Sequence, residues 1–429
     1  MKKQLQYFGT DGIRGIIGKD LDLEFFIKIG YAISNLAKNM RVLIARDTRQ
    51  SGESIKQSLI QGLSAKNVEI FDAGIIPTGA LCFLTKNFNF DYGIMITASH
   101  NPSEYNGIKI FDKNGFKISK DIEFFLEKNL KKPKKIKNIP TQQFSSIPYL
   151  DYLENIFNKK ICDMKIFLDC ANGATSSYAR KIFEKTGAKV CVTHKKGEIN
   201  KNASVLNKEV FISNFKKSKA DLGFCFDGDG DRAMCITKDF VVLDGDRILY
   251  ILAKHFKQSK VVGTIMTNYG LEKILSKSNI SLIRTDVGDR NIALKLSKKN
   301  LLVGAEESGH VIIKNFSTTG DGLITALVLL QIYMKNPKLF KRASSLKMFN
   351  VYSEKIHTKN KQIIFSKHIK KKIQKQSERL KKSGRLIVRA SGTEPVIRVT
   401  VECNNKSLAT SVLNNICNEI KLSQLTSKN

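Results

Sequence analysis

Three aspartates alternate with glycines in the segment FDGDGDR: Asp227, Asp229 and Asp231. Carboxylates this close together repel one another unless a cation lies among them, and their oxygens are ligands that Mg²⁺ and Ca²⁺ prefer. The segment is no EF-hand loop, because Arg232 stands where that loop needs glycine and Lys238 where it needs glutamate. A polar hairpin turn is the alternative, since Asp-Gly is common in such turns. Three aspartates in register favour a Mg²⁺ site.

A serine stands beside a histidine in the segment TASHNP, as Ser99 and His100. A Ser–His hydrolase needs the histidine within hydrogen-bond reach of the hydroxyl, and a carboxylate to orient it. We expect an extended segment, in which adjacent side chains point to opposite sides, and the chain has no GxSxG elbow. His100 is therefore not expected to act as the base for Ser99. A hydroxyl beside a Mg²⁺ site is suited to carrying a phosphoryl group.

Hydroxyl and guanidinium groups gather in the segment RASGTEPVIRV, which contains Arg389, Ser391, Gly392, Thr393 and Arg398. Guanidinium forks, hydroxyls and backbone N–H groups bind anions, and glycine allows a close approach of the backbone. A plain strand–turn–strand is the alternative. The two arginines and the Ser/Thr content favour a phosphate-binding loop.

Weaker signals come from three other segments. In GAEESGH, the carboxylate of Glu306 and the hydroxyl of Ser308 are spaced to contact vicinal sugar hydroxyls, although an ordinary loop has the same appearance. FGTDGIRG offers Thr10 and Arg14 on a glycine-rich turn, and Lys109 follows Ser99 by ten residues. Either cation could be a surface charge. Their flanking glycines favour loops beside a ligand.

A repeated unit of strands and helices is expected to position these segments. Three times the chain runs through strand, helix, strand, helix and strand, and the third strands are DYGIMITASH, DLGFCFDGDGD and LLVGAEESGH. This alternation indicates parallel, doubly wound sheets. Ligands collect beyond the carboxyl ends of such strands. All three third strands end in polar loops, so we expect the chemistry there.

Four domains are expected along the chain. The boundaries that we predict are 1–145, 146–243, 244–346 and 347–429, with Lys131–Pro148 as a charged linker after the first unit. The first three are related α/β domains with mixed, mainly parallel sheets. The last combines three strands with a Lys-rich helix and a final helix, which indicates a smaller α+β domain.

The composition is that of a soluble globular protein, with 42% hydrophobic and 26% charged residues among 429. The longest apolar runs, such as LITALVLLQIY, are too short to cross a bilayer and fit a buried helix. The N-terminal segment MKKQLQYFGTDG has no apolar region of a secretory signal. The eight cysteines form no CxxC pair. We therefore expect a cytoplasmic protein without a membrane partner.

The four motifs together resemble the α-D-phosphohexomutase superfamily from end to end, with TASHNP, FDGDGDR, the sugar loop and RASGTEPVIRV in the family's order. Within it, YFGTDGIRG, GHVIIKNFSTTGDG and RASGTEPVIRVTVE are most similar to the bacterial phosphoglucosamine mutases. The loop GAEESGH departs from the more usual Gly-Gly-Glu-Gln-Ser-Gly-His. Glu307 thereby adds a negative charge near the expected substrate.

The resemblance implies four domains around one active-site cleft. In the active form Ser99 would be phosphorylated, and its phosphate and the three aspartates would bind one Mg²⁺. The phosphoserine would donate its phosphoryl group to glucosamine 6-phosphate. The resulting 1,6-bisphosphate would reorient and return its 6-phosphate to Ser99, leaving glucosamine 1-phosphate for UDP-N-acetylglucosamine and cell-wall synthesis.

The resemblance also implies roles for the remaining residues. Glu306 and Ser308 would hold sugar hydroxyls, and the segment from Arg389 to Thr393 with Arg398 would hold the non-reacting phosphate. Arg14 would stabilise charge and Lys109 would act as a base near the reacting oxygen, while His100 would shape the site. A homodimer is the expected assembly.

Three other functions compete with this one. A phosphomannomutase or phosphoglucomutase shares the catalytic motifs, and a metal-dependent phosphatase would release the phosphate to water. A nucleic-acid-binding protein would use the net charge of +33. However, the excess lysines are spread along the whole chain without a nucleic-acid-binding module, as A+T-rich coding would produce. We therefore expect a sugar phosphate, and no nucleic acid, as the partner.

Overall fold

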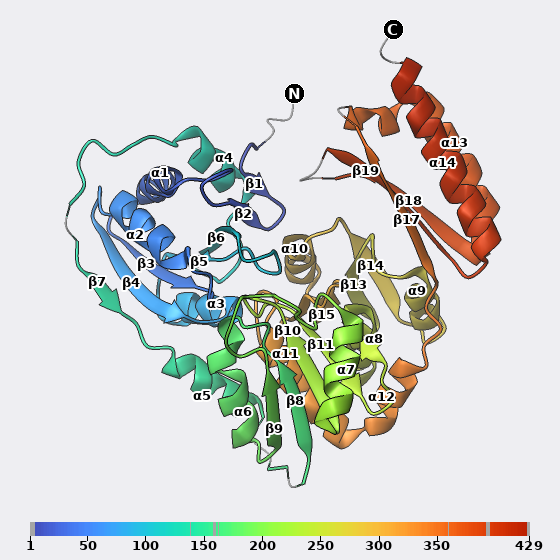
Figure 1. Ribbon diagram of the computed structural model, residues 1–429, viewed down its shortest axis with the longest axis horizontal. Helices are drawn as coiled ribbons and strands as arrows, with labels where there is room; N and C mark the ends of the chain where they lie inside the picture. The colour runs from blue at the N-terminus through green and yellow to red at the C-terminus, as the bar shows by residue number, and fades with distance from the viewer. Residues whose placement is uncertain are drawn as a thin grey trace. The chain divides into compact units, whose positions relative to one another are not determined.

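The computed structural model describes residues 5–137, 139–157, 160–161, 163–358, 360–391 and 395–426 (Figure 1). The chain divides into two compact units. The larger consists of Met1–Thr264 with Ile283–Ser345, and the smaller of Ile265–Leu282 with Leu346–Asn429.

The first sheet of the larger unit has the strand order β1-β2-β6-β5-β3-β4-β7. Its strands are β1 (Phe8–Gly9), β2 (Gly12–Ile16), β3 (Met40–Arg46), β4 (Val68–Ile75), β5 (Tyr92–Ile96), β6 (Tyr105–Asp112) and β7 (Thr141–Gln143). The neighbours β5, β3, β4 and β7 are parallel, whereas β6, β2 and β1 are added antiparallel. The accompanying helices are α1 (Leu23–Ser34), α2 (Gly52–Leu63), α3 (Thr78–Asn87) and α4 (Lys120–Lys128).

Apolar residues at helical spacing explain how this sheet is covered. Phe26 and Ile29 of α1 and Leu59 of α2 are fully buried in one cluster with Ile44 and Ile94 of the central strands. Side chains alternate between the two faces of a strand, so α1 and α2 cover the face to which Ile44 and Ile94 point.

The second sheet has the order β12-β11-β10-β8-β9. Its strands are β8 (Lys165–Asp169), β9 (Lys189–Thr193), β10 (Leu222–Phe226), β11 (Ala233–Thr237) and β12 (Val242–Leu243). The neighbours β9, β8 and β10 are parallel, and β11 returns antiparallel beside β10. The helical segments of this part are α5 (Ile147–Ile156), η1 (Ala174–Ser177), α6 (Ala179–Lys185) and α7 (Lys208–Ser218).

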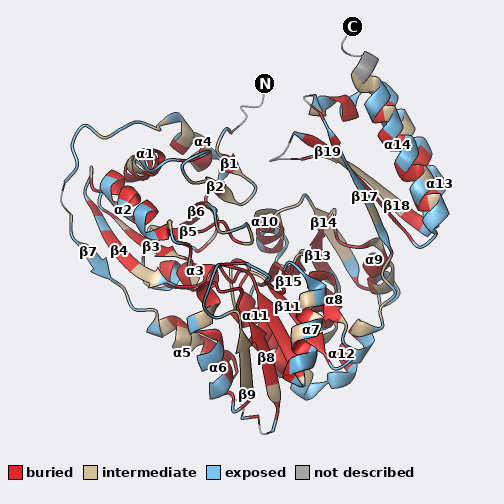
Figure 2. Cartoon of the chain, viewed as in Figure 1, coloured by how far each residue is buried: buried red, intermediate tan, exposed pale blue. Residues whose placement is uncertain are grey.

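The third sheet has the order β14-β13-β15-β16. Its strands are β13 (Lys260–Thr264), β14 (Ser281–Thr285), β15 (Val303–Ala305) and β16 (Val311–Ile313). The accompanying helices of the larger unit are α8 (Gly245–His255), α10 (Asp289–Lys299), α11 (Gly322–Lys335) and α12 (Pro337–Ser344). The apolar run LITALVLLQIY lies in α11, which is buried over most of its length, as predicted (Figure 2).

The smaller unit contains an antiparallel sheet of order β17-β19-β18. Its elements are α9 (Tyr269–Ser276), β17 (Val351–His357), η2 (Lys361–Phe365), α13 (Lys367–Leu380), η3 (Lys381–Ser383), β18 (Gly384–Ala390), β19 (Val396–Cys403) and α14 (Lys406–Thr426). Ile397, Val399 and Val401 of β19 join the apolar core with α13 and α14. The alternation of side chains therefore turns Arg398 and Thr400 to the face away from these helices.

The predicted fold class is confirmed: three α/β arrangements with mixed sheets precede a small C-terminal α+β domain. In the described part of the chain, no helix combines the length and the apolar character that a membrane span requires.

One feature recurs in the three sheets of the larger unit. The third predicted strand of each repeat (β5, β10 or β15) is followed by a polar loop and then by an antiparallel strand (β6, β11 or β16). TASHNP, FDGDGDR and EESGH are these loops. The aspartate segment is thus a hairpin connection as well as a cluster of carboxylates, and the three loops occupy equivalent positions in the three repeats.

Candidate active site

The three equivalent hairpin loops meet one another in the larger unit. Ser99 of the first loop donates its Oγ hydrogen to Asp227 Oδ2 of the second, over 2.7 Å. Arg232 and His310 form a β-bridge between the second and third loops, and the Ala233 N–H donates to the Gly309 carbonyl over 3.0 Å. The sheets therefore bring together loops that are about 70 to 200 residues apart in sequence.

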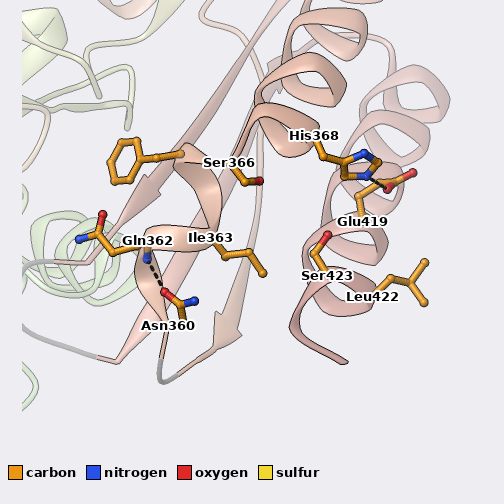
Figure 3. Close-up of a pocket in the computed structure, with 9 residues that line it drawn as sticks. Asn360, Gln362, Ile363, Ser366, His368, Glu419, Leu422 and Ser423 are labelled. Carbon is orange, nitrogen blue, oxygen red and sulfur yellow. Dashed lines mark hydrogen bonds and ion pairs between the residues drawn. The ribbon is translucent and has the colours of Figure 1, made fainter. Parts of the chain in front are cut away.

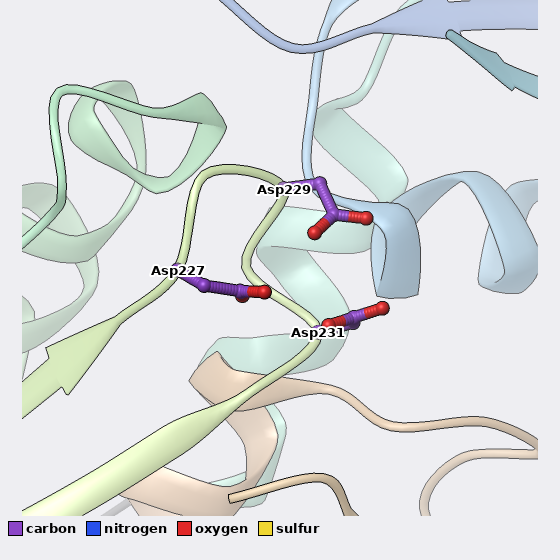
Figure 4. Close-up of side chains that lie close together, drawn as sticks. All are labelled: Asp227, Asp229 and Asp231. Carbon is purple, nitrogen blue, oxygen red and sulfur yellow. The ribbon is translucent and has the colours of Figure 1, made fainter. Parts of the chain in front are cut away.

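The carboxylates of Asp227, Asp229 and Asp231 converge in the second loop (Figure 4). One oxygen of each lies within 4.8 Å of the others, and all three residues are buried. Among the described atoms, Asp229 Oδ1 and Asp231 Oδ1 are buried without a hydrogen-bond partner. Burial and the charges of the other two aspartates raise the pKa of Asp227 to about 8. Two buried oxygens without a donor, in a cluster of three carboxylates that repel one another, fit a divalent cation such as Mg²⁺.

Ser99 is fully buried beside these carboxylates. Its backbone has φ +52°, in the left-handed region that residues other than glycine seldom adopt. Its N–H donates to Thr97 Oγ1 over 2.8 Å. The structure therefore places the Ser99 hydroxyl against the aspartate cluster.

The extended conformation that we expected for TASHNP is wrong at Ser99, because the left-handed turn brings His100 Nδ1 to 3.5 Å from Ser99 Oγ. The turn removes the geometric objection to a Ser–His pair. Burial, Arg232 and Arg14 nevertheless lower the pKa of His100 to about 3, and within the described residues no carboxylate hydrogen bonds to its ring. His100 thus lacks the orienting carboxylate of a hydrolase base.

Lys109 reaches the same carboxylates from β6. Its Nζ lies 2.7 Å from Asp229 Oδ2 and 2.5 Å from Asp231 Oδ2. Burial disfavours the ammonium, but the charges of Asp11, Asp229 and Asp231 raise the pKa of Lys109 well above its ordinary value. These charges favour the ammonium form, whereas a cation among the three aspartates would offset them. The base role implied by the resemblance stays a prediction. The geometry suits Lys109 to stabilising negative charge.

Arg14 contacts the serine loop through Asn101, to whose Oδ1 its Nη1 donates over 3.0 Å. It also forms an ion pair with Asp11. Thr10, on the same glycine-rich turn, is exposed. The structure therefore brings Arg14 against the loop of Ser99, whereas Thr10 is exposed.

Glu306 and Ser308 lie in the third hairpin loop. The Glu306 N–H donates to the His310 carbonyl over 2.9 Å, and the Gly309 N–H donates to the Glu306 carbonyl over 3.0 Å, which closes the turn. Glu306 Oε1 accepts a hydrogen bond from the Gly288 N–H over 2.9 Å. Both Glu306 and Ser308 are partly exposed.

A buried histidine that the sequence reasoning did not select belongs to the same cluster. His310 Nε2 lies 3.1 Å from Asp231 Oδ2 and 3.6 Å from Asp289 Oδ2. Burial lowers the pKa of His310, but Asp231 and Asp289 outweigh it and raise the pKa to about 9. The Lys117 Nζ bridges Asp289, at 2.5 Å, to Asp11. The available signal was the place of His310 at the end of a motif that had already been singled out.

The predicted phosphate loop lies in the smaller unit. Arg389 of β18 is the direct cross-strand partner of Arg398 on β19, and Lys355 of β17 is the partner of Arg398 on its other side. We call these three residues the cation row. Ser391 is buried, and its N–H donates to the Val396 carbonyl over 2.9 Å. The other two predicted loop residues, Gly392 and Thr393, lie outside the described residues.

Lys355 was missed by the sequence reasoning because only the register of β17 against β19 reveals its position. It stands more than thirty residues before the predicted loop. Three cations side by side on one face of a sheet repel one another. Such a row is suited to binding an anion.

A separate pocket of about 860 Å³ in the smaller unit lies between η2, the start of α13 and the end of α14 (Figure 3). His368 Nε2 lies 3.0 Å from Glu419 Oε2, and the Gln362 N–H donates to Asn360 Oδ1 over 3.1 Å. None of the residues predicted for a site lines this pocket.

Comparison with known protein families covers nearly the whole chain. The α/β/α domains I, II and III of phosphoglucomutase/phosphomannomutase match residues 5–137, 148–240 and 244–349, and its C-terminal domain matches residues 353–419.

Individual relatives show the same likeness. A phosphoglucosamine mutase of Dictyoglomus turgidum is 40% identical over 421 residues, which cover 92% of this chain and 94% of that protein. A phosphoglucosamine mutase of Pelagibacter ubique is 37% identical over 446 residues, with 97% and 99% coverage.

Solved structures share the fold. A phosphoglucomutase/phosphomannomutase family protein from Burkholderia thailandensis has a TM-score of 0.80 at 23% identity and covers 97% of both chains. The N-acetylphosphoglucosamine mutase of Aspergillus fumigatus, solved with GlcNAc-6P and magnesium, has a TM-score of 0.69 at 17% identity and covers 98% of this chain and 96% of that one.

Proposed function

We propose that this chain, which belongs to the phosphoglucosamine mutase family, interconverts glucosamine 6-phosphate and glucosamine 1-phosphate through a phosphoserine at Ser99. The observation that carries the proposal is the buried Ser99 hydroxyl, 2.7 Å from Asp227 in a cluster of three carboxylates. The product would feed the synthesis of UDP-N-acetylglucosamine and of the cell wall.

Two phosphoryl transfers at one serine complete the reaction. In the first, the P–O bond to Ser99 Oγ breaks, a bond forms from phosphorus to O1 of glucosamine 6-phosphate, and the sugar hydroxyl proton ends on the serine. In the second, the 1,6-bisphosphate has turned round, and its 6-phosphoryl group moves to Ser99 Oγ while O6 takes up the serine proton. Positioning and charge neutralisation dominate such transfers.

The three aspartates and the phosphate on Ser99 would hold Mg²⁺, which when bound neutralises charge on the phosphoryl oxygens. Lys109 lies within 2.7 Å of two of these carboxylates. Its ammonium would stabilise charge that develops on the transferred group. Arg14 would do the same from the side of Asn101, which it contacts, and His100 would shape the site.

The sugar and its second phosphate would be bound by the remaining predicted residues. The carboxylate of Glu306 would accept hydrogen bonds from the sugar hydroxyls, and the hydroxyl of Ser308 would donate to them or accept from them. The second phosphate would bind the loop that contains Arg389, Ser391, Gly392 and Thr393, together with Arg398. A single cradle that takes either phosphate lets one serine serve both ends of the bisphosphate.

We further propose that the chain forms a cytoplasmic homodimer of four-domain subunits, with the boundaries 1–145, 146–243, 244–346 and 347–429. Analytical ultracentrifugation tests the assembly: a single species at the monomer mass at micromolar concentration would contradict it.

Replacement of Ser99 by alanine tests the central step. Ser99→Ala should abolish isomerisation of glucosamine 6-phosphate in a coupled assay, and wild-type protein should contain a species heavier by one phosphate in intact-mass spectra. Ser103→Ala is the matched control, because Ser103 stands four residues away and its hydroxyl donates to Glu198 over 2.6 Å. An active Ser99→Ala enzyme would refute the carrier role.

The same assay distinguishes the competing functions. Turnover of mannose 6-phosphate or glucose 6-phosphate above that of glucosamine 6-phosphate would favour a phosphomannomutase or phosphoglucomutase. Release of inorganic phosphate faster than isomerisation would favour a phosphatase.

A further inference from the structure

The side chain of Arg49 is fully buried in the larger unit, directly after β3. A buried guanidinium is costly unless each of its donors finds an acceptor. Arg49 was not among the residues selected from the sequence, and the proposed phosphoryl transfer assigns it no role. Its partners are therefore informative.

Four of its hydrogen bonds go to backbone carbonyls, three in the loop that carries Ser99 and one at the first residue of β6. Nη2 donates to the carbonyls of Ser99 and Asn101, over 2.9 and 2.8 Å. Nη1 donates to the carbonyls of Pro102 and Tyr105, the latter over 2.7 Å. The planar fork of an arginine has enough donors in fixed directions to hold four acceptors at once.

The carboxylate of Asp47 extends this contact to the other side of Ser99. Arg49 Nε donates to Asp47 Oδ2 over 3.1 Å, and Thr97 Oγ1 donates to the same oxygen over 2.7 Å. Thr97 Oγ1 in turn accepts from the Ser99 N–H. The backbone N–H of Ser99, through Thr97, and the carbonyl of Ser99 are thus both connected to the Arg49–Asp47 pair.

Asn200, from the second repeat, holds the same loop from another element. Its Nδ2 donates to the carbonyls of Ser99 and Asn101 over 2.7 and 2.9 Å, the two carbonyls that Arg49 Nη2 contacts. We call Arg49, Asp47 and Asn200 the Ser99 clamp. Its direct contacts with the loop reach backbone carbonyls and Thr97, and none reaches the Ser99 hydroxyl.

We propose that Arg49, through the Ser99 clamp, is a positioning residue that keeps Ser99 in its left-handed conformation, with its hydroxyl directed at Asp227, while the phosphoryl group leaves and returns. The inference rests on the proposed function of Ser99 as carrier. The serine gains and loses a doubly charged group in every cycle, and a loop held only by its side chain would shift with each transfer. Backbone contacts persist in both states, so the acceptor oxygen stays in line with the incoming phosphorus.

Arg49→Lys tests this role, because lysine keeps the charge but lacks the planar fork. We expect kcat for glucosamine 6-phosphate to fall by about a hundredfold, the effect of displacing a reacting group by roughly 1 Å. KM should stay within about threefold, since Glu306 and the cation row are untouched.

Lys56→Met is the matched control for a merely structural role. Lys56 Nζ forms a largely buried ion pair with Asp72 Oδ2 over 2.6 Å in the same sheet region, away from the serine loop. The control should lower the melting temperature and leave kcat unchanged. An Arg49→Lys enzyme with wild-type kcat would overturn the proposal.

A second measurement separates this proposal from the carrier role itself. Dephosphorylated enzymes are mixed with glucose 1,6-bisphosphate, and the gain of one phosphate is followed by intact-mass spectrometry. Wild type should be phosphorylated fast, Arg49→Lys at least tenfold more slowly, and Ser99→Ala not at all. Phosphorylation of Ser99→Ala would refute the carrier, whereas equal rates for wild type and Arg49→Lys would refute only the clamp.

Asn200→Ala is the alternative test of the clamp if Arg49→Lys does not fold. It removes two of the clamp's hydrogen bonds and leaves Arg49 in place. A slower gain of phosphate together with a lower kcat supports the clamp, and wild-type values for both would overturn it.

Discussion

Neutralising the central cation of the C-terminal sheet should weaken phosphate binding without weakening the fold. Arg398 lies between Lys355 and Arg389 in the cation row, as the direct cross-strand partner of both. Like charges directly opposite each other on a sheet destabilise it by roughly 0.2–1 kcal/mol. Arg398→Gln should therefore change the free energy of unfolding of the ligand-free protein by no more than about 1 kcal/mol.

The effect on the anion should be larger. A charge-assisted hydrogen bond to phosphate contributes about 1.5–3 kcal/mol, which corresponds to a roughly ten- to hundredfold loss of affinity. At a phosphate concentration of 100 Kd, binding stabilises the wild type by about 2.7 kcal/mol. A tenfold weaker variant at the same concentration would gain only about 1.4 kcal/mol by the same relation.

Thermal and chemical unfolding with and without inorganic phosphate measure both quantities. Lys375→Gln is the control, because it removes one positive charge from an exposed position of α13 in the same domain. The control should keep the stabilisation by phosphate. A large loss of ligand-free stability in Arg398→Gln, with the phosphate effect intact, would show that Arg398 is a structural residue and that the anion binds elsewhere.

Three further results are expected. Excess EDTA should stop isomerisation, Mg²⁺ should restore it better than Ca²⁺ because it holds tighter octahedral geometry, and Asp229→Asn should resemble EDTA treatment; full activity in EDTA would contradict the metal site. Gly288→Ala should cost about 1–3 kcal/mol of stability because the φ of Gly288 is +119°. It should also raise KM, because the Gly288 N–H donates to Glu306. An unchanged KM would show that this contact does not affect substrate binding. The hydrogen bond to Asp169 raises the pKa of His194, so this contribution to stability is present below the unfolded pKa of about 6.5 and is lost as pH rises through the folded value. The difference in melting temperature between wild type and His194→Gln should accordingly be larger at pH 6 than at pH 8.5. An equal difference at both pH values would refute the contribution of the His194–Asp169 pair to stability.

Local sequence patterns were sufficient to predict the strands and the loops that follow them. Apolar runs such as LGFCF and VLIA become buried strands because burial on both faces requires continuous apolar residues. Polar and glycine-rich segments then mark the loops at their ends. This is why the aspartate cluster and the loop of Ser99 were located correctly in the fold.

The remaining features depend on contacts between segments far apart in the chain. The carbonyl of Ser99, whose backbone is left-handed, accepts hydrogen bonds from Arg49 and from Asn200 of another repeat, and no local pattern predicts these contacts. Lys355 joins Arg398 only through strand register. The raised pKa of Lys109 depends on the charges of Asp11, Asp229 and Asp231, all about a hundred residues away in the sequence.

Each of the three hairpin loops is anchored at both ends by the strands that it connects. A residue can therefore change inside one loop while the ladder of hydrogen bonds beneath it keeps its register. If the repeats descend from one ancestral unit, duplication gave three copies of the same loop between two antiparallel strands. The sequence of each copy could then diverge independently. The proposed nucleophile, cation ligands and sugar contacts would then represent three specialisations of a single loop, and exchanging loop sequences between repeats would be a direct way to test that history.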